Sequence, residues 1–343
     1  MSARTAVEAT ALRTLLGLPE KVQRVLAGRP VVLDGQTLAT DVQLMLRLAA
    51  IARPEGDEQP SPEEMRRAMA QETRIVGGRQ RVGAVEDLEV AGRPARRYLP
   101  SRPLVASGAG PLLVFLHGGG FLEGDLDSHD APCRLLAEES GVPVLAVTYR
   151  LSPESKLPAA HDDAYDAFRW VHEHAAELGA DPARIAVGGD SAGGNLAAWI
   201  ALCAARDGLP VAWQLLVYPC TDGLRDTESL RLFGEGFYLT RERIAWFDQS
   251  YTNHLDERAD ERLSPVRADL PEGLAPAYVV TAGFDPLRDE GETYARRLAD
   301  AGVEVELKRF PGQVHGFLNI VGVGRSCRAA VLEIAARMRD ALA

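Results

Sequence analysis

Three residues of the chain, Ser191, Asp285 and His315, are suited by type to nucleophilic attack on a carbonyl group. A serine hydroxyl is a weak nucleophile unless a base removes its proton during the attack, and a carboxylate must hold that base in the correct tautomer and stabilise its cation. The sequence therefore predicts Ser191 as the nucleophile, His315 as the general base and Asp285 as the residue that orients His315.

Ser191 is at the centre of Gly189-Asp190-Ser191-Ala192-Gly193, a G-x-S-x-G motif between an apolar run at 185–187 and a helical pattern at 196–206. In such a strand-to-helix turn the serine lies on a strained backbone and its hydroxyl stands clear of both elements. Glycine is expected on either side because a side chain there would collide with the neighbouring strand or helix. The motif alone also fits a glycine-rich connection without chemistry, so its interpretation depends on other segments.

The other reactive residues also come directly after predicted strands. His117-Gly118-Gly119-Gly120 follows the apolar run at 112–116, and Asp285 and His315 follow the last two runs of the chain. Ligands of an open parallel sheet gather at the carboxyl ends of its strands, so we expect these residues to meet Ser191 there.

An oxyanion hole is predicted from the backbone N–H groups of Gly119, Gly120 and Ala192. Glycine N–H groups can approach an oxyanion closely, and the N–H of Ala192 lies at a helix amino terminus, where the dipole favours negative charge. A triple glycine by itself is weak support, but its place after a strand and before G-x-S-x-G strengthens the interpretation.

Asp190, Asp289, Glu290 and His117 lie near the same strand ends and compete for the catalytic roles. We expect the side chain of Asp190 to point away from the serine and Asp289 to lie one helical turn beyond its strand. His117 is expected to order the glycine loop.

Two clusters, His161-Asp162-Asp163 and His172-Glu173-His174, resemble metal ligands. Both lie in predicted helices, where a carboxylate on a solvated face is the simpler interpretation, and residues two apart on a helix point in different directions. The sequence therefore predicts no metal site and no cofactor.

The 343 residues are 46% hydrophobic and 25% charged, which is typical of a globular protein of one or two domains. A net charge of −11 argues against nucleic acid as a partner and disfavours anionic membranes. The four cysteines show no C-x-x-C spacing and are expected to be buried free thiols.

Charged residues interrupt the amino-terminal segment, and no apolar run approaches the roughly 18 residues of a membrane span. We therefore expect a cytoplasmic protein without a secretory signal or membrane span.

From about Val85 apolar runs alternate with helical patterns, which predicts a doubly wound, mainly parallel sheet with helices on both faces. The expected strands are at 85–90, 95–99, 112–116, 142–149, 185–187, 211–218, 277–282 and 303–309, and the expected helices at 159–178, 196–206, 290–299 and 328–341.

The region before the sheet is predicted to be helical. Apolar stripes at Val22, Val25 and Leu26, and at 38–49, need a partner surface, and a polar connector at 53–60 precedes a helix that Ser61 caps. We expect residues 1–75 to form a helical cap segment.

We expect residues 76–343 to form the catalytic domain. It should carry a cap insertion at about 221–262, because the space between the strands at 211–218 and 277–282 is too long for a simple crossover and contains a helix at 241–254.

Several of these motifs together resemble the hormone-sensitive-lipase-like branch of the α/β-hydrolases, the bacterial family IV esterases. The resemblance covers residues from about Pro111 to the carboxyl terminus and rests on His117-Gly118-Gly119-Gly120-Phe121, Tyr149-Arg150-Leu151-Ser152-Pro153-Glu154, the segment from Gly189 to Ala197, Asp285-Pro286-Leu287-Arg288-Asp289 and His315-Gly316-Phe317. Ser152 departs from the family, which usually has alanine there. The resemblance implies an α/β-hydrolase fold with a helical cap over the substrate pocket.

Five aromatic residues near these motifs and in the insertion are expected to line that pocket: Phe121, Phe237, Tyr238, Phe284 and Phe317. The reaction we expect is hydrolysis of short- to medium-chain carboxylic esters through an acyl-enzyme. An amidase or deacetylase with the same triad stays open, because acyl transfer from nitrogen uses the same groups. A non-catalytic receptor on this fold is disfavoured because His315 is present.

The last predicted strand is expected to lie at an edge of the sheet, where it could pair with a second copy of the chain. Its charges at Glu304, Glu306, Lys308 and Arg309 could instead keep the protein monomeric.

Overall fold

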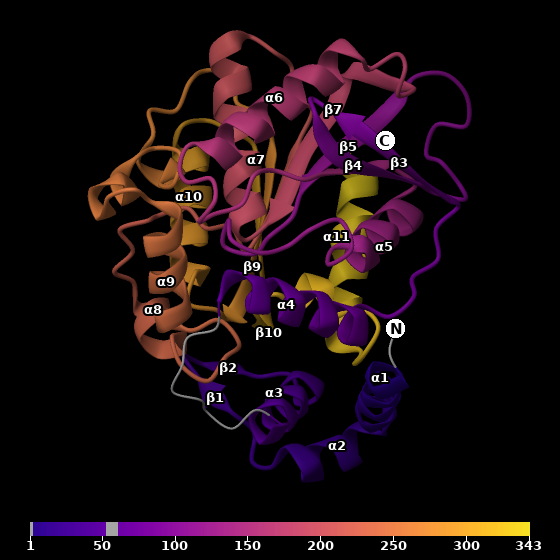
Figure 1. Ribbon diagram of the computed structural model, residues 1–343, viewed down its shortest axis with the longest axis vertical. Helices are drawn as coiled ribbons and strands as arrows, with labels where there is room; N and C mark the ends of the chain where they lie inside the picture. Colours follow the sequence, from indigo (N-terminus) through magenta and orange to yellow (C-terminus); the bar gives the residue numbers. More distant parts are fainter. Residues whose placement is uncertain (1–2, 53–60) are drawn as a thin grey trace.

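A sheet of eight strands forms the centre of the protein in the computed structural model, which describes residues 3–52 and 61–343 (Figure 1). The strand order is β10-β9-β8-β7-β5-β6-β4-β3; neighbours from β10 to β6 are parallel, and β4 is antiparallel to both β6 and β3. The strands are β3 (Ala84–Val90), β4 (Arg93–Leu99), β5 (Gly110–Leu116), β6 (Val144–Val147), β7 (Ala180–Asp190), β8 (Gln214–Val217), β9 (Ala277–Phe284) and β10 (Val305–Val314). The predicted α/β class and mainly parallel sheet are confirmed.

Helices cover both faces of the sheet. On one face lie α6 (Ala159–Glu173), α7 (Ala192–Asp207) and α10 (Arg288–Asp300), and on the other lie α5 (Asp130–Ser140) and α11 (Ser326–Ala341). Successive strand residues point to opposite faces, so β5 is buried on both sides: Leu113 and Phe115 belong to one apolar core, and Leu112, Val114 and Leu116 to the other.

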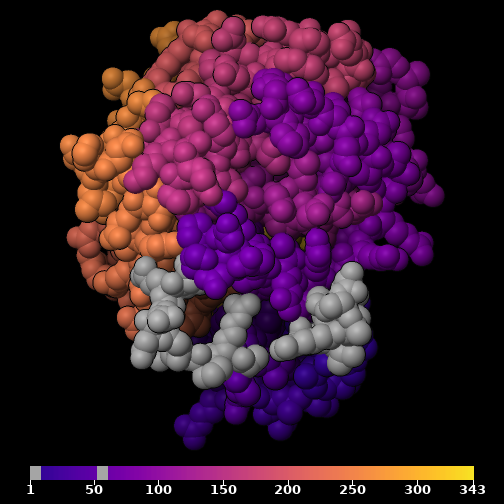
Figure 2. All heavy atoms as spheres, in the orientation of Figure 1, coloured from indigo at the N-terminus to yellow at the C-terminus, as the bar shows by residue number. Residues whose placement is uncertain are grey.

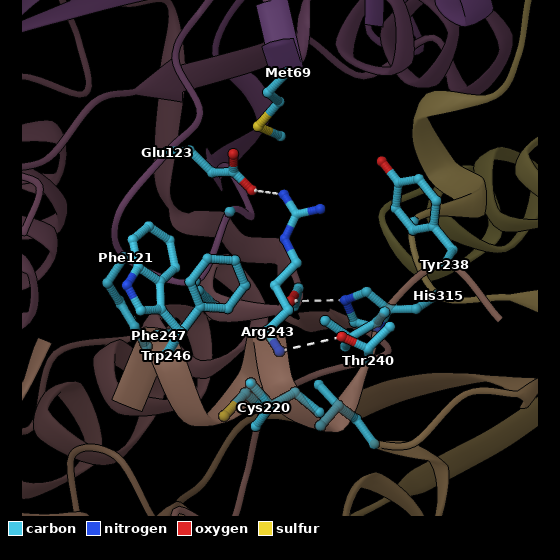
Figure 3. Close-up of a pocket in the computed structure, with 18 of the residues that line it drawn as sticks. Met69, Phe121, Glu123, Cys220, Tyr238, Thr240, Arg243, Trp246, Phe247 and His315 are labelled. Carbon is cyan, nitrogen blue, oxygen red and sulfur yellow. Dashed lines mark hydrogen bonds and ion pairs between the residues drawn. The ribbon is translucent and has the colours of Figure 1, made fainter. Parts of the chain in front are cut away.

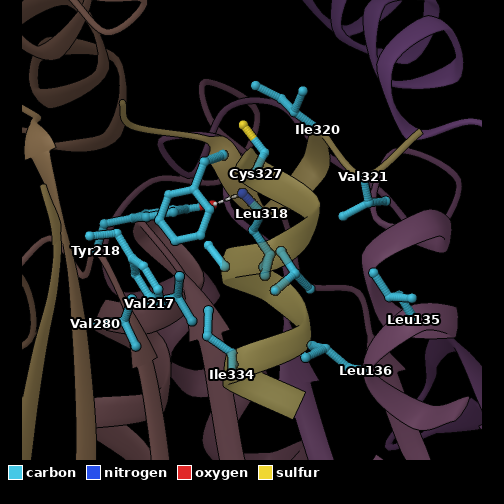
Figure 4. Close-up of a cluster of buried hydrophobic side chains, with 14 of the residues drawn as sticks. Leu135, Leu136, Val217, Tyr218, Val280, Leu318, Ile320, Val321, Cys327 and Ile334 are labelled. Atoms are coloured by element: carbon cyan, nitrogen blue, oxygen red, sulfur yellow. Dashed lines mark hydrogen bonds between the residues drawn. The ribbon is translucent and has the colours of Figure 1, made fainter. Parts of the chain in front are cut away.

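The apolar core between the sheet and α11 supports the candidate site from below. Ile334 of α11 packs together with Leu135 and Leu136 of α5 and with residues of β8 and β9 (Figure 4). Tyr218, just after β8, is fully buried there, and its hydroxyl accepts a hydrogen bond from the N–H of Leu318 at 3.3 Å.

The first part of the chain is mainly helical, as predicted, and the helices before residue 53 lie at the lower end of the molecule (Figures 1 and 2). Ser61 caps the helix Pro62–Gly77 as expected: its hydroxyl accepts the N–H of Glu64, whose carboxylate accepts the N–H of Ser61. The predicted connector at 53–60 lies outside the described residues. The elements are α1 (Ala3–Gly17), α2 (Glu20–Ala27), the short strands β1 (Val32–Leu33) and β2 (Gln36–Thr37), α3 (Thr40–Ala52) and α4 (Pro62–Gly77).

One expectation for this region is wrong. The stripe of α2 was expected to be covered, but Val22, Val25 and Leu26 are exposed, and α2 buries Gln23 and Ala27. Gln23 is drawn inward because its amide donates to the carbonyl oxygens at the end of α1. Hydrogen bonds at the helix junction therefore decide which face of α2 is buried.

The predicted insertion lies between β8 and β9. It contains α8 (Glu228–Phe233), α9 (Arg241–Tyr251) and two 3₁₀ turns, Leu255–Ala259 and Pro265–Arg267. In the part of the chain that the structure describes, no helix has the length and apolar character needed to cross a membrane.

A buried ionic cluster ties the insertion to α10. Arg225 Nε lies 2.8 Å from Glu290 Oε2, and Arg225 Nη1 lies 3.1 Å from Asp248 Oδ2 of α9. Glu290 Oε1 also accepts the N–H groups of Thr221 and Asp222. Burial raises the pKa of Glu290 to about 7, although Arg225 and the two N–H groups act in the opposite direction.

This cluster makes stability depend on pH. Between the ordinary pKa of 4.5 and about 7, folded Glu290 retains a proton that the unfolded chain releases, so the stability contributed by Glu290 falls as pH rises through this window. Relative to Glu290→Gln, the free energy of unfolding of the wild type should fall by roughly 1–3 kcal/mol between pH 5 and pH 7.5. Urea unfolding at several pH values measures the difference. Glu272→Gln, at an exposed position, is the control, and a difference that rises with pH would contradict the assignment.

Candidate active site

The three predicted catalytic side chains meet at the carboxyl ends of their strands. Ser191 follows β7, Asp285 follows β9 and His315 follows β10. His315 Nε2 lies 2.9 Å from Ser191 Oγ, and His315 Nδ1 lies 2.8 Å from Asp285 Oδ2. The other carboxylate oxygen of Asp285 accepts the N–H of Leu287 at 2.8 Å. With its proton on Nδ1, His315 presents a lone pair to the serine hydroxyl, which is the arrangement that general-base catalysis needs.

The backbone at Ser191 is strained, with φ 56° and ψ −118°. The two glycines of the motif make this turn sterically possible. A Cβ on Gly189 would lie 2.4 Å from the backbone of Gly193, and a Cβ on Gly193 would lie 2.0 Å from the carbonyl oxygen of Leu116. The expectation that only glycine fits on either side of the serine is confirmed.

The backbone N–H groups predicted to hold an oxyanion belong to residues that line the same cavity as Ser191. Gly119 and Gly120 both have positive φ, and Ala192 is the first residue of α7. Among the described residues, none accepts a hydrogen bond from the N–H of Gly119, Gly120 or Ala192. These three donors are therefore free for a ligand oxygen.

Asp190 holds the glycine loop rather than the catalytic histidine. Its Oδ1 accepts the N–H of Gly118 at 2.9 Å and lies 3.2 Å from Nε2 of the buried His129. Burial opposes ionisation of Asp190, but His129 and the N–H of Gly118 outweigh it and lower the pKa of this carboxyl. His129 is not among the residues predicted from the sequence, because its neighbours form no motif that indicates where its ring lies.

The other competing residues also have structural partners. His117 is buried, which lowers its pKa to about 4, and its Nδ1 bonds to the carbonyl oxygen of Gly118. Asp289 accepts the N–H of Ser229 and pairs with Arg288. The expected structural role of His117 in the glycine loop is consistent with these contacts.

No group of His, Cys, Asp and Glu side chains in the described ranges is arranged to hold a metal ion. His161 is fully buried and bonds to Asn195 and Tyr251. The expectation that its carboxylate neighbours face solvent is wrong for Asp163, which is buried and pairs with Arg150.

The expected burial of all four cysteines is only partly correct. Cys133 and Cys327 are buried free thiols, whereas Cys203 and Cys220 are half-buried. Cys220 also lines the cavity that contains Ser191.

A cavity of about 400 Å³ opens above Ser191 and His315 (Figure 3). This volume is within the usual range for small-molecule sites. Helix α4 contributes Met65, Ala68, Met69 and Glu72 to one wall, and the insertion contributes the opposite wall, which includes Tyr238, Leu239, Thr240, Arg243, Ile244, Trp246 and Phe247.

A protein-family model described as the alpha/beta hydrolase fold matches residues 113–319, more than half of the chain. The chain belongs to this α/β-hydrolase family, in its hormone-sensitive-lipase-like branch. The matched segment contains all three side chains of the hydrogen-bonded triad.

Several relatives of this α/β-hydrolase have esterase names. A carboxylic ester hydrolase, LipN, of Mycobacterium tuberculosis is 45% identical over 345 residues, covering 96% of this chain and 90% of its own. An ethyl acetate hydrolase of Pseudomonas putida is 38% identical and covers 83% of this chain and 93% of its own. The solved structure of an esterase from Pyrobaculum calidifontis has a TM-score of 0.83 at 37% identity, with 89% of this chain and 99% of that chain covered.

The pocket of this α/β-hydrolase includes two of the five predicted aromatic residues, Phe121 and Tyr238. Ser152 explains how Phe121 is held, since both its N–H and its hydroxyl donate to the carbonyl oxygen of Phe121, at 2.8 and 3.1 Å. The departure from alanine at this position thus adds a hydrogen bond beneath the pocket wall.

The other three aromatic residues do not line the pocket, which corrects the prediction. Phe284 directly precedes Asp285 in the chain, so its side chain points to the opposite face and packs against Phe233 and Phe237. Phe317 is fully buried and lies edge-on to the ring of Tyr218, which itself contacts His315. These aromatic residues support the site from behind.

The residues that line the pocket also change which helices belong to the expected cap. Helix α4 contributes four lining residues, whereas none of the described residues of α1, α2 and α3 lines the cavity. Glu123 and Arg243 also line the cavity, although neither is among the pocket residues predicted from the sequence. A signal for Arg243 was available, because Thr240 caps α9 and residues 243 and 247 then share one helix face.

Proposed function

We propose that this α/β-hydrolase is a serine carboxylesterase that cleaves short- to medium-chain carboxylic esters through an acyl-enzyme. The observation that carries the proposal is the hydrogen-bonded series from Ser191 through His315 to Asp285, next to three N–H groups that are free for an oxyanion. The names of the relatives support the same reaction.

In the first half-reaction Ser191 Oγ attacks the ester carbonyl carbon while His315 Nε2 takes the hydroxyl proton. The negative charge on the carbonyl oxygen is stabilised by the N–H groups of Gly119, Gly120 and Ala192. Protonated His315, held by Asp285, then gives its proton to the leaving alkoxide. The alcohol departs and an ester of Ser191 remains.

In the second half-reaction water attacks this acyl-enzyme. His315 takes a proton from the water, the same three N–H groups stabilise the second tetrahedral intermediate, and the proton returns to Ser191 as the acid departs. Every proton is carried by a side chain of this chain, so the steps use no cofactor.

Chain-length preference is proposed to arise from the roof of the pocket, which α4 and the insertion form. Each buried methylene stabilises binding by about 0.8 kcal/mol while space remains. A cavity of about 400 Å³ supports a rise of kcat/KM with acyl length, followed by a fall once the chain meets the roof. The proposed cap consists of α4 and the insertion. It is therefore smaller than the cap expected from the sequence, which included the whole of residues 1–75.

Hydrolysis of 4-nitrophenyl esters of graded acyl length, beside matched 4-nitroanilides, tests the proposed function. We expect the esters to be cleaved with an optimum at short to medium chains and the anilides far more slowly. Anilides cleaved as fast as esters would favour the alternative, an amidase that uses the same triad.

Self-association is a separate proposal. β10 lies at an edge of the sheet, and its charges are paired within the chain, Glu306 with Arg337 and Lys308 with Glu333. A second copy could therefore add its own β10 to this edge. Light scattering that gives a monomer mass across a wide concentration range would refute self-association.

A cytoplasmic location of the protein also stays a prediction.

A further inference from the structure

An ion pair crosses the roof of the pocket. Arg243 is in the first turn of α9, and one nitrogen of its guanidinium, Nη2, donates to Glu123 Oε1 (Figure 3). Glu123 is only 3% exposed and follows the glycine loop. The pair therefore joins the insertion to the segment that carries the proposed oxyanion donors.

Arg243 lies close to the reacting end of the pocket. The ring of Phe247, one turn further along α9, lies directly over Gly120, since a Cβ on that glycine would be 2.4 Å from the ring. The guanidinium carbon of Arg243 is 5.4 Å from the centre of the same ring. The N–H of Glu123 donates to the carbonyl oxygen of Gly119 at 3.0 Å. A substrate chain that extends from Ser191 along this wall would pass Arg243.

The Arg243 guanidinium has N–H groups that no acceptor in the described residues uses. Arginine carries five N–H donors, and within the described residues Nε and Nη1 of Arg243 donate to no side chain or carbonyl group. Figure 3 shows the guanidinium in the space between Phe121 and Phe247 on one side and Tyr238 on the other. An alkyl chain bound there would remove water from these N–H groups and offer no acceptor, which is unfavourable. An acceptor oxygen on the substrate would replace the lost water.

The charges around Arg243 indicate which kind of acceptor fits. Glu123 bonds to the guanidinium, Glu72 adds a second negative charge near it, and Glu242 also lines the cavity. A substrate carboxylate would be a further negative charge beside these groups and would be repelled. A neutral oxygen, such as a ketone or a second ester carbonyl, avoids this repulsion.

We propose that this esterase prefers esters with a neutral hydrogen-bond acceptor a few atoms from the scissile carbonyl, and that Arg243 recognises this acceptor. The inference rests on the proposed ester hydrolysis and adds a substrate class to it. A site built to donate hydrogen bonds discriminates strongly against analogues that lack the acceptor.

The test compares substrates of matched chain length, with and without the acceptor oxygen. On the acyl side these are 4-nitrophenyl 4-oxopentanoate, 4-nitrophenyl pentanoate and the anionic 4-nitrophenyl succinate; on the alcohol side they are 4-oxopentyl acetate and pentyl acetate. The kcat/KM ratio of the oxo ester to the alkyl ester is measured for the wild type, Arg243→Met and the control Arg241→Met. Arg241 is exposed, lies on the same helix and does not line the pocket. Intrinsic reactivities cancel when the ratio is compared between enzymes.

We expect Arg243→Met to lower this ratio about tenfold or more for the acyl pair or the alcohol pair, and Arg241→Met to leave both ratios unchanged. Because Arg243→Met leaves Glu123 buried without its partner, the double variant Arg243→Met with Glu123→Gln should show the same fall. Unchanged ratios for both pairs, or a preference of the wild type for the succinate ester, would overturn the inference while ester hydrolysis stands. A wild type that does not cleave 4-nitrophenyl acetate would overturn the proposed function, and this inference with it.

Discussion

Replacing Ser191 with alanine is expected to lower kcat for ester hydrolysis by about 10⁴- to 10⁶-fold. The variant retains the oxyanion donors and the pocket but has no hydroxyl at the position 2.9 Å from His315 Nε2. The fold should be unaffected, because alanine removes only one oxygen from a half-buried side chain. Initial rates with a 4-nitrophenyl ester, at enzyme concentrations high enough to detect the residual rate, measure the loss.

Ser101→Ala is a suitable control, because Ser101 is exposed and lies outside the pocket. It should retain the wild-type rate. A Ser191→Ala enzyme that keeps more than a few per cent of wild-type activity, after purification free of host esterases, would show that another residue is the nucleophile.

The second large effect is expected at Asp285. Asparagine there has nearly the same shape, but it carries no negative charge and its NH₂ group can face His315 Nδ1, which would favour the wrong tautomer of the imidazole. In serine proteases the corresponding change lowers kcat about 10⁴-fold, and we expect a loss of similar size for Asp285→Asn. The loss should appear in kcat rather than KM, because the carboxylate lies behind His315 and is fully buried.

Asp289→Asn is the matched control for Asp285→Asn. Asp289 is the nearby carboxylate that competes in the sequence, but it accepts the N–H of Ser229 and pairs with Arg288. Asp289→Asn should lower the free energy of unfolding and leave kcat nearly unchanged. If the two variants exchange these outcomes, the acid of the triad has been assigned to the wrong residue.

The sequence was most informative where backbone geometry and chemistry are local. Ser191 could be placed because the glycines around it are required by contacts of 2.0–2.4 Å, and such a requirement is visible as a motif. The strand ends placed Asp285 and His315, since parallel strands bring their carboxyl ends to one edge. The alternation of strands and helices indicated the sheet before its order could be known.

Side-chain direction in the pocket wall could not be predicted in the same way. Phe284 directly precedes Asp285 and turns into the core, because successive strand residues point to opposite faces. Phe317 lies two residues after His315, in a short 3₁₀ turn, and its ring is buried against Tyr218. Glu123 and Arg243 are 120 residues apart, and nothing in either segment indicates that they pair. The buried face of α2 could not be predicted from its apolar stripe either, since hydrogen bonds of Gln23 decide which face is buried.

The central claim is that catalysis proceeds through an ester of Ser191, and trapping that ester tests it most directly. The wild-type enzyme would be mixed with a 4-nitrophenyl ester, quenched in acid within milliseconds, digested and analysed by mass spectrometry. We predict the acyl mass on the peptide that contains Ser191, and no such peptide from Ser191→Ala. An acyl group found on a different residue, at a level that accounts for turnover, would contradict the account.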